Sequence, residues 1–280
     1  MRYNLNMKIA KQKKIKSSED GLLVKNILSK QMGFSRREIS RFHVSGSIYL
    51  NDEKCRLTQE VHTNDIVTVR TEEQPQLESK PIILYEDTDI VVVNKPAGML
   101  AVQGKSKRES VQSVMRKRYP HAESPLIVHR LDMATSGLMV IAKTTEAYRC
   151  LQQQFAKREV KKRYVAVLSH DEDCRSGEIS LPLRPDLNDR PRQIVDFQYG
   201  RKAETSYKTE GGKRIYLYPH TGRTHQLRVH CAHSNGLNNP IQGDELYGTR
   251  ADRLYLHAEE LSFRHPTTHE WVTFHAPCPF

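Results

Sequence analysis

Nine consecutive residues, His129 to Gly137, hold the side chains best suited to chemistry, in the order His-Arg-Leu-Asp-Met-Ala-Thr-Ser-Gly. Asp132 lies two positions after Arg130, and the stretch ends in a Thr-Ser-Gly turn. An aspartate with an ordinary pKa of about 4 is ionised at neutral pH, so Asp132 could act as a nucleophile without a separate base. The guanidinium of Arg130 could bind a phosphate. An isolated Arg-x-Asp pair is also typical of an ion pair that braces a turn.

Residues 161–168, Lys-Lys-Arg-Tyr-Val-Ala-Val-Leu, form a second stretch of interest. Strand alternation places Tyr164, Ala166 and Leu168 on one face, so the phenol of Tyr164 can point into a cleft. Its ring could stack on a pyrimidine, and its hydroxyl could assist the removal of a proton from a ring carbon. A core tyrosine near the end of a strand is the alternative interpretation.

A third stretch, residues 219–230, reads Pro-His-Thr-Gly-Arg-Thr-His-Gln-Leu-Arg-Val-His. Thr224 is expected to cap a short helix. His225 and Arg228 then lie three positions apart and share one side of that helix. Arg223, at the helix start, could bind a phosphate.

The histidines of this region suggest a metal-dependent hydrolase as an alternative; they are His220, His225, His230 and His233. Their spacing argues against a metal site, because only the last two could chelate one ion together. No H-E-x-x-H or C-x-x-C pattern accompanies them. We therefore expect no metal ion.

Together the three stretches resemble, in order and content, the motifs of the RluA family of RNA pseudouridine synthases, which convert uridine into its C-glycoside isomer. The resemblance extends over residues 82–280. It implies that Asp132 is the nucleophile, that Tyr164 is the catalytic tyrosine and that Arg228 pairs with the aspartate. Such a pair would keep Asp132 ionised in a cleft where burial alone raises a carboxyl pKa. Arg223 is the competing candidate for this pairing.

The resemblance also implies how RNA is handled. The target base must leave its stack, and Arg130 is expected to fill the gap, at a flipping cost on the order of a few kcal/mol. His129, beside it, is expected to contact RNA. No cofactor is needed, because the uracil is detached, turned and rejoined in one pocket. Whether Asp132 attacks the anomeric carbon of the sugar or the pyrimidine ring stays open.

Residues 239–244, Asn-Pro-Ile-Gln-Gly-Asp, resemble a loop of the same family with two departures. The family more often has His before the proline and an apolar residue at position 242. These departures concern the packing of the loop rather than the chemistry.

The composition fits a protein that binds a polyanion in the cytoplasm. The 280-residue chain has a formal net charge of +11 and a pI of about 9.4, which favours RNA as a partner. Its five cysteines are scattered, which suits a reducing compartment. No apolar run approaches the roughly 18 residues of a membrane span, so neither membrane insertion nor secretion is expected. We expect a monomer.

Charge and polarity divide the chain into four parts. Residues 1–16 contain six basic side chains and no acidic one, and predict a mobile basic tail. Residues 17–74 would form a small module with a net charge of −1. Residues 75–81 are polar, contain two prolines and predict a linker. Residues 82–280 would form the catalytic domain.

The module at residues 17–74 resembles an S4-type RNA-binding domain. An apolar helix ending at Gly33 precedes a second helix, which Ser35 and Glu38 open as a capping-box pair, and strand-like runs follow. The second helix would present three positive charges to RNA phosphates, those of Arg36, Arg37 and Arg41. A helical pair with surface arginines and no RNA partner is the alternative.

The catalytic part mixes strand-like runs with few helices and has no regular βαβ repeat, which favours an α+β fold. The resemblance implies the pseudouridine synthase fold, a central mixed, largely antiparallel sheet flanked by helices and loops. Helices are expected over residues 145–158, capped by Thr144, and over 224–234. Strands are expected at residues 82–85, 89–94, 138–142, 161–168, 177–183, 204–209 and 213–219.

The sequence therefore predicts an RNA pseudouridine synthase with an aspartate nucleophile. Large-subunit ribosomal RNA is the favoured substrate and transfer RNA the alternative. The catalytic part most resembles the small bacterial family members that act on ribosomal and transfer RNA. Those lack an N-terminal S4-type module, so the added module leaves the target open. A non-catalytic RNA-binding protein of the same fold would be expected only if a catalytic position were missing. Asp132, Tyr164 and Arg228 are all present.

Overall fold

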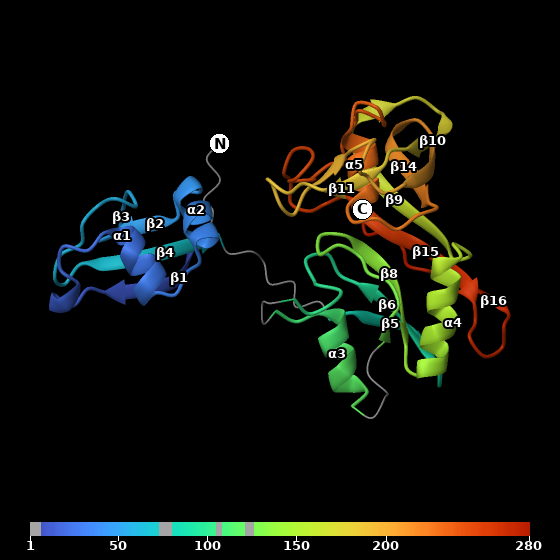
Figure 1. Cartoon of the computed structure of the whole chain (residues 1–280), viewed down its shortest axis with the longest axis horizontal. Coiled ribbons are helices and arrows are strands. Elements are labelled where there is room, and N and C mark those ends of the chain that lie inside the picture. The colour runs from blue at the N-terminus through green and yellow to red at the C-terminus, as the bar shows by residue number, and fades with distance from the viewer. Residues whose placement is uncertain (1–6, 73–79, 105–107, 121–125) are drawn as a thin grey trace. The chain divides into compact units, whose positions relative to one another are not determined.

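The computed structural model describes residues 7–72, 80–104, 108–120 and 126–280. The chain forms two compact units, Met1–Glu78 and Ser79–Phe280, each with its own hydrophobic core (Figure 1). The boundary falls inside the segment expected to be a linker, most of which lies outside the described residues.

The N-terminal unit combines short helices with a four-stranded antiparallel sheet. Its strands are β1 (Met7–Lys14), β2 (Ile48–Leu50), β3 (Glu53–Lys54) and β4 (Ile66–Glu72). Its helical segments are η1 (Ser17–Glu19), α1 (Val24–Asn26), η2 (Ile27–Gln31) and α2 (Arg36–Val44). The strand order is β1-β4-β2-β3. Ile27 and Leu28 from the helices share one core with Val67 and Val69 of the sheet.

The start of α2 is the capping box that the sequence predicts. The Glu38 backbone N–H donates to Ser35 Oγ at 3.3 Å, and the Ser35 N–H donates to Glu38 Oε2 at 2.8 Å. Two backbone donors at the helix start are thereby satisfied. The apolar helix expected before Gly33 is present as α1 and η2, and Gly33 adopts a φ of +74°.

The prediction of a mobile tail over residues 1–16 is wrong for residues 7–14. These residues form β1, which pairs antiparallel with β4 from Met7 opposite Glu72 to Lys14 opposite Ile66. The strand lies at the edge of its sheet, where lysines are a common protection against pairing with other chains. The lysine-rich pattern therefore reflects an exposed edge strand. Residues 1–6 lie outside the described residues.

The C-terminal unit is built on one ten-stranded sheet, and its α+β architecture confirms the prediction. The strands are β5 (Ile82–Glu86), β6 (Ile90–Lys95), β7 (Leu126–Ile127), β8 (Ser136–Ala142), β9 (Lys161–Glu172), β10 (Ser176–Ser180), β13 (Glu204–Thr209), β14 (Gly212–Pro219), β15 (Leu256–Arg264) and β16 (Trp271–His275). The order is β10-β13-β14-β9-β15-β8-β6-β5, with β7 paired to β8 and β16 to β15. Among the strand pairs of the described residues only β8 with β15 is parallel, so the sheet is mixed and largely antiparallel.

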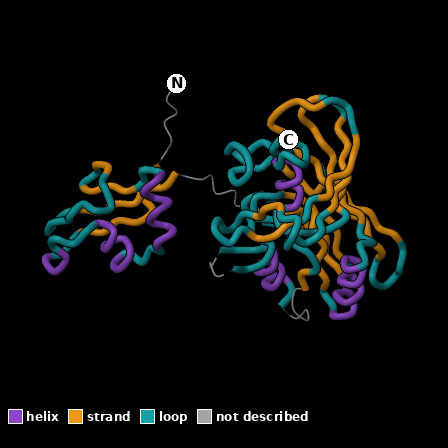
Figure 2. The backbone as a smooth tube through the Cα atoms, turned by 45° about the horizontal axis from the view of Figure 1, so that its top comes forward, coloured by secondary structure: helices purple, strands orange, loops and turns teal. Residues whose placement is uncertain are grey.

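Helices cover both faces of the β6–β8 part of this sheet. They are α3 (Val111–Arg118) and α4 (Thr145–Ala156), which lie at the end of the unit away from α5 (Gln226–Ala232; Figures 1 and 2). Val140 of β8 packs in one core with Leu151 of α4, whereas its neighbour Met139 packs in another with Met115 of α3. All seven residues of β8 are therefore buried. Thr144 caps α4 as predicted, since its side chain accepts a hydrogen bond from the Ala147 N–H at 3.1 Å.

The helix expected over residues 224–234 is shorter and differently capped. It begins at Gln226, and its N-cap is His225, with φ 54° and ψ 16°, rather than Thr224. The Gln226 side chain fixes the preceding turn: its Oε1 accepts hydrogen bonds from the Thr221 hydroxyl at 2.7 Å and the Arg223 N–H at 3.0 Å. These contacts hold His225 in the left-handed region, where non-glycine residues are uncommon.

A two-stranded ribbon, β11 (Leu183–Pro185) with β12 (Gln193–Val195), lies beside α5. Leu183 and Val229 share a small core there. The Gln193 backbone N–H donates to the hydroxyl of Tyr247 at 2.7 Å. In the described ranges, no helix is both long and apolar enough to cross a membrane.

Candidate active site

The loop that carries Asp132 is anchored by the buried strand that follows it. At Gly137, with φ +118°, a side chain would collide with the backbone of Ala258, the residue that Gly137 faces in the parallel β8–β15 pair. Glycine is therefore required for this close approach. The Thr135 N–H donates to the Asp132 carbonyl at 3.2 Å and closes the turn between Asp132 and β8.

Lys95, at the end of β6, fastens the same loop from the other side. Its side chain is fully buried, and its Nζ donates to the carbonyls of Pro96 (2.9 Å), Met99 (2.8 Å) and Met133 (3.1 Å). Burial lowers the pKa of Lys95 to about 7, against an opposing effect of the Asp132 charge. The loop is thus tied to the sheet at the residue directly after Asp132.

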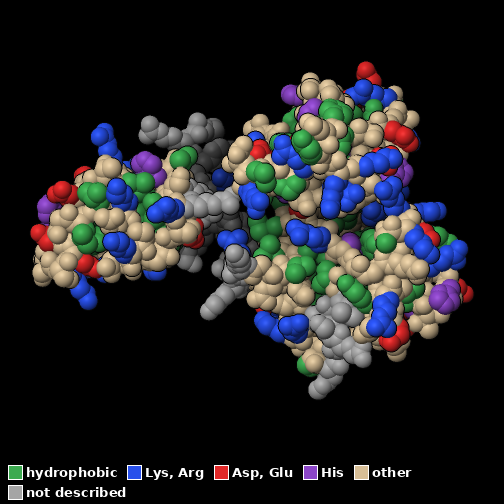
Figure 3. Space-filling view, viewed as in Figure 1, with side chains coloured by type: hydrophobic (Ala, Val, Ile, Leu, Met, Phe, Trp, Pro, Cys, Tyr) green, Lys and Arg blue, Asp and Glu red, His purple; other side chains and the backbone are tan. Residues whose placement is uncertain are grey.

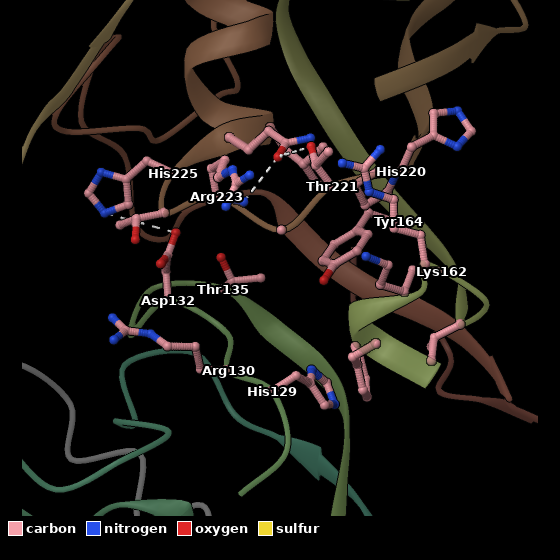
Figure 4. A pocket seen from close by; sticks show the side chains of 18 of the residues that line it. His129, Arg130, Asp132, Thr135, Lys162, Tyr164, His220, Thr221, Arg223 and His225 are labelled. Carbon is pink, nitrogen blue, oxygen red and sulfur yellow. Dashed lines mark hydrogen bonds and ion pairs between the residues drawn. The ribbon is translucent and has the colours of Figure 1, made fainter. Parts of the chain in front are cut away.

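A cavity of about 480 Å³ lies between this loop, the start of β9 and the segment before α5 (Figure 4). Its volume is in the range of small-molecule sites. All six catalytic or RNA-binding residues predicted in the catalytic part line it, namely His129, Arg130, Asp132, Tyr164, Arg223 and Arg228. The structure therefore brings three distant sequence stretches into one pocket.

Arg228 does not form the expected pair with Asp132. Its guanidinium binds Asp244 through two hydrogen bonds, Nε to Oδ2 at 2.7 Å and Nη2 to Oδ1 at 2.5 Å. Asp244 Oδ1 also accepts the backbone N–H groups of Leu246 and Tyr247, at 3.0 and 3.1 Å. Both charged partners are buried, with 4% and 1% of their surface exposed. The carboxylate of the 239–244 loop thus matches the planar fork of Arg228, and the predicted Asp132 pairing is corrected.

The charge of Asp132 nevertheless reaches Arg228. Burial lowers the pKa of Arg228, but the hydrogen bonds and charge of Asp244, with a smaller effect of Asp132, raise it overall. His225 lies within ion-pair range of Asp132, with its Nε2 3.9 Å from Asp132 Oδ2 (Figure 4). From the sequence, His225 enters only as a helix neighbour of Arg228 and as a member of the rejected metal set, so this contact is not predicted.

Tyr164 presents its ring to the pocket from β9, as the strand alternation predicts (Figure 4). Burial raises the pKa of its hydroxyl, and the negative charge of Asp132 raises it further. The phenol is therefore neutral at neutral pH. A neutral phenol can stack on a base and donate a hydrogen bond, but it is a poor acceptor for a proton from carbon.

His129 forms part of the pocket wall. Its ring stacks on Phe155 at 4.8 Å between centroids, and its Nε2 accepts the Val140 N–H at 3.1 Å. Burial lowers its pKa to about 3, so the imidazole carries no charge at neutral pH. His129 can therefore offer an RNA base a surface, but it does not offer a phosphate a charge.

Positive charge comes instead from side chains around the pocket. Arg130 and Arg158 are exposed, and Lys162 lies deeper, where burial lowers its pKa to about 8. Arg223 also lines the pocket and donates from Nε to the Lys202 carbonyl at 3.1 Å. Figure 3 shows Lys and Arg side chains on both sides of the hollow in the C-terminal unit. Lys162 is not among the site residues predicted from the sequence, although it lies two positions before Tyr164 in the same stretch. No sequence pattern indicates Arg158.

The three arginines predicted to bind RNA from α2 belong to the N-terminal unit. Arg36 is exposed on the first turn of the helix. The side chains of Arg37 and Arg41 lie outside the described part of the chain.

The four histidines of residues 220–233 do not form a metal-binding group within the described residues. Another group in the described part of the chain has side chains spaced closely enough to bind a metal ion. Its possible ligand atoms lie within 4.8 Å of one another and belong to Asp87, Asp89 and His265. The pocket lining contains none of these three residues. His265 Nε2 forms a hydrogen bond with Asp87 Oδ2 at 2.8 Å, so two of the three possible ligand atoms already bind each other.

Comparison with known proteins assigns the chain to a family. A model of the RNA pseudouridylate synthase family matches residues 89–233. The dual-specificity RNA pseudouridine synthase RluA of Escherichia coli (strain K12) is 43% identical over 218 residues, covering 74% of this chain and 97% of that protein. The chain belongs to the RluA family of RNA pseudouridine synthases. This RluA-family enzyme is an isomerase that converts uridine in RNA into pseudouridine.

Further relatives agree with this assignment. The Haemophilus influenzae dual-specificity RNA pseudouridine synthase RluA is 40% identical over 221 residues, covering 75% of this chain and 98% of that protein. The solved structure of human RNA pseudouridylate synthase domain containing 1 matches with a TM-score of 0.60 at 29% identity, over 72% of this chain and 84% of that one. Human domain containing 4 matches with a TM-score of 0.56 at 26% identity, over 71% and 88%. About a quarter of this synthase is unmatched in the bacterial relatives.

Proposed function

We propose that this synthase modifies specific uridines of large-subunit ribosomal RNA, with transfer RNA as the second candidate. The main support for an RNA substrate is the pocket, which groups Asp132 and Tyr164 with Arg130 and Arg223. The chain's net charge of +11 suits a long polyanion. The bacterial relatives match about three quarters of this chain, and the chain has a separate N-terminal unit, which we propose directs the enzyme to a ribosomal rather than a transfer RNA target.

Mapping pseudouridines in total RNA from cells with and without this protein tests the target. We expect one or a few positions of large-subunit ribosomal RNA to lose the modification, and the purified enzyme to restore them in vitro. Loss confined to transfer RNA would overturn the ribosomal target but leave the synthase activity in place.

Asp132 is proposed as the nucleophile, attacking either the anomeric carbon of the ribose or the pyrimidine ring. In the net reaction the bond from the uracil N1 to the ribose C1′ breaks and a bond from C5 to C1′ forms. C5 loses its proton and N1 gains one, so the reaction balances without an oxidant, reductant or cofactor. The loop anchored by Lys95 and Gly137 holds Asp132 in place for this attack.

The other pocket residues are proposed to bind and turn the base. Tyr164 stacks on the uracil, and Arg130, an exposed residue of the pocket lining, fills the space that the flipped base leaves. Arg223 contacts a phosphate of the target strand. Arg228, held by Asp244, contributes a fixed positive charge near Asp132.

The N-terminal unit is proposed to be an S4-like RNA-binding module. The helical segments that pack on a small sheet, with Arg36 exposed on α2, support this role. Arg37 and Arg41 on the same helix are proposed to contact RNA as well. The unit would add affinity and target choice without taking part in bond making.

A chain truncated to start at Ser79 should keep the catalytic unit and lose this affinity. We expect normal turnover at saturating RNA, weaker binding of full-length substrate, and a shallower dependence of log affinity on log salt, by roughly 0.7–0.9 for each phosphate that the shortened chain no longer binds. Turnover at saturation is the deciding measurement. If truncation abolishes it while the shortened protein stays folded, the N-terminal unit takes part in the active site.

This chain by itself supplies Asp132, Tyr164 and Arg228 to the pocket. We propose that the active form is a monomer and that it acts in the cytoplasm. Sedimentation at the concentration of the activity assay should give the mass of one chain. A dimer that loses its activity when it dissociates into single chains would contradict the proposal.

A further inference from the structure

We propose that His225 positions Asp132 by donating a hydrogen bond from its Nε2–H to the carboxylate, with Tyr247 selecting the tautomer that makes this possible. The inference rests on the proposed role of Asp132 as the nucleophile. His225 acts through Asp132, so it is a positioning residue and not a group that reacts.

The backbone aims His225 at Asp132. The residue sits in the left-handed region, with φ +54°, at the point where the chain enters α5. This conformation costs free energy for a non-glycine residue, and the Gln226 side-chain contacts hold it in place. His225 is 9% exposed, so its ring has little freedom to turn away. Its Nε2 lies 3.9 Å from Asp132 Oδ2.

The hydrogen bond on the far side of the ring favours a proton on Nε2. The Tyr247 hydroxyl lies 2.9 Å from His225 Nδ1 and already accepts the Gln193 backbone N–H at 2.7 Å. Its own proton can therefore go to Nδ1, which leaves the imidazole proton on Nε2, facing Asp132. The other tautomer would turn a lone pair toward a carboxylate. The 3.9 Å separation exceeds a hydrogen bond, but catalytic contacts of this kind commonly tighten when substrate binds.

Burial keeps the imidazole of His225 neutral. Burial lowers the pKa of His225 most, Arg228 and Arg130 lower it further, and Asp132 and Asp244 oppose them. A neutral donor orients a carboxylate without neutralising it, so Asp132 stays available as a nucleophile. Arg228 binds Asp244 through Nε and Nη2, so this edge of its guanidinium is not available to Asp132. Tyr247 lies against that guanidinium, 5.3 Å from ring centroid to Cζ, which fixes the position of its hydroxyl.

Two substitutions of His225 separate donation from mere packing. In His225→Gln the side-chain amide can place an N–H near the Nε2 position, whereas in His225→Asn the amide is too short to reach Asp132, although Asn suits the positive φ. We expect the single-turnover rate at saturating RNA to fall roughly 100-fold in His225→Asn, with unchanged RNA affinity, and to recover at least about tenfold in His225→Gln. Tyr247→Phe should give an intermediate loss of rate.

His269→Asn is the matched control, since His269 also has a positive φ, of 58°, and does not line the pocket. It should run at the wild-type rate. Equal rates for His225→Asn and His225→Gln, or a wild-type rate for His225→Asn, would overturn the inference. Asp132→Asn assayed alongside keeps the two proposals apart: if it remains active, the nucleophile assignment fails, whereas if it is inactive and both His225 variants are normal, only the role of His225 fails.

Discussion

Asp132→Asn should abolish pseudouridine formation and leave RNA binding within about twofold of wild type. The amide keeps the size of the side chain but is not a nucleophile, and loss of a nucleophile costs on the order of 10⁴-fold or more in rate. Affinity should hold because the change removes no contact to a phosphate. The measurement is tritium released from C5 of labelled uridine in single turnover, with RNA affinity measured on the same preparation. Turnover by the Asn variant at a rate near wild type would show that another group attacks.

Arg130→Ala provides the contrast, because it should affect a different step. If Arg130 fills the space left by the flipped base, its loss should slow modification of a paired target uridine most. A substrate with a mismatched or unpaired target should recover part of the rate for Arg130→Ala and none for Asp132→Asn. Equal defects of Arg130→Ala on both substrates would remove Arg130 from base extrusion.

The parts of the site that the sequence predicts are those encoded by a continuous stretch. Asp132 and Arg130 share one loop, and the uninterrupted apolar run behind them predicts β8, which both helices α3 and α4 then bury. Tyr164 follows from strand alternation alone. In such cases the local pattern decides the position of the side chain, and the tertiary structure only brings the stretches together.

The interpretations that fail depend on partners distant in sequence or on unusual backbone conformations. Arg228 has two carboxylates in its neighbourhood, and only the folded loop shows that Asp244 fits its two donors. The contact of His225 with Asp132 requires a positive φ, which the side chain of Gln226 imposes through tertiary hydrogen bonds. The sequence does not predict β1, because the lysines of an edge strand have the same pattern as those of a basic tail.

The buried Arg228–Asp244 pair should be the most sensitive electrostatic contact of the catalytic unit. Asp244→Asn leaves the Arg228 guanidinium buried without a counter-charge, and Arg228→Met leaves the carboxylate in the same state. Each single change is expected to lower the free energy of unfolding by about 3–5 kcal/mol. Denaturant titration followed by the fluorescence of Trp271, the one tryptophan of the chain, reports on the unit that contains both residues.

The double variant Arg228→Met with Asp244→Asn separates stability from catalysis. With both charges gone, no unpaired charge remains buried, so most of the stability should return, and the two single effects should be far from additive. Turnover at saturating RNA should remain roughly 100-fold below that of the wild type, because the fixed positive charge that acts on Asp132 is still missing. A double variant that regains stability and wild-type turnover together would show that Arg228 serves the fold alone, and the field at Asp132 would then have to come from other groups in the pocket.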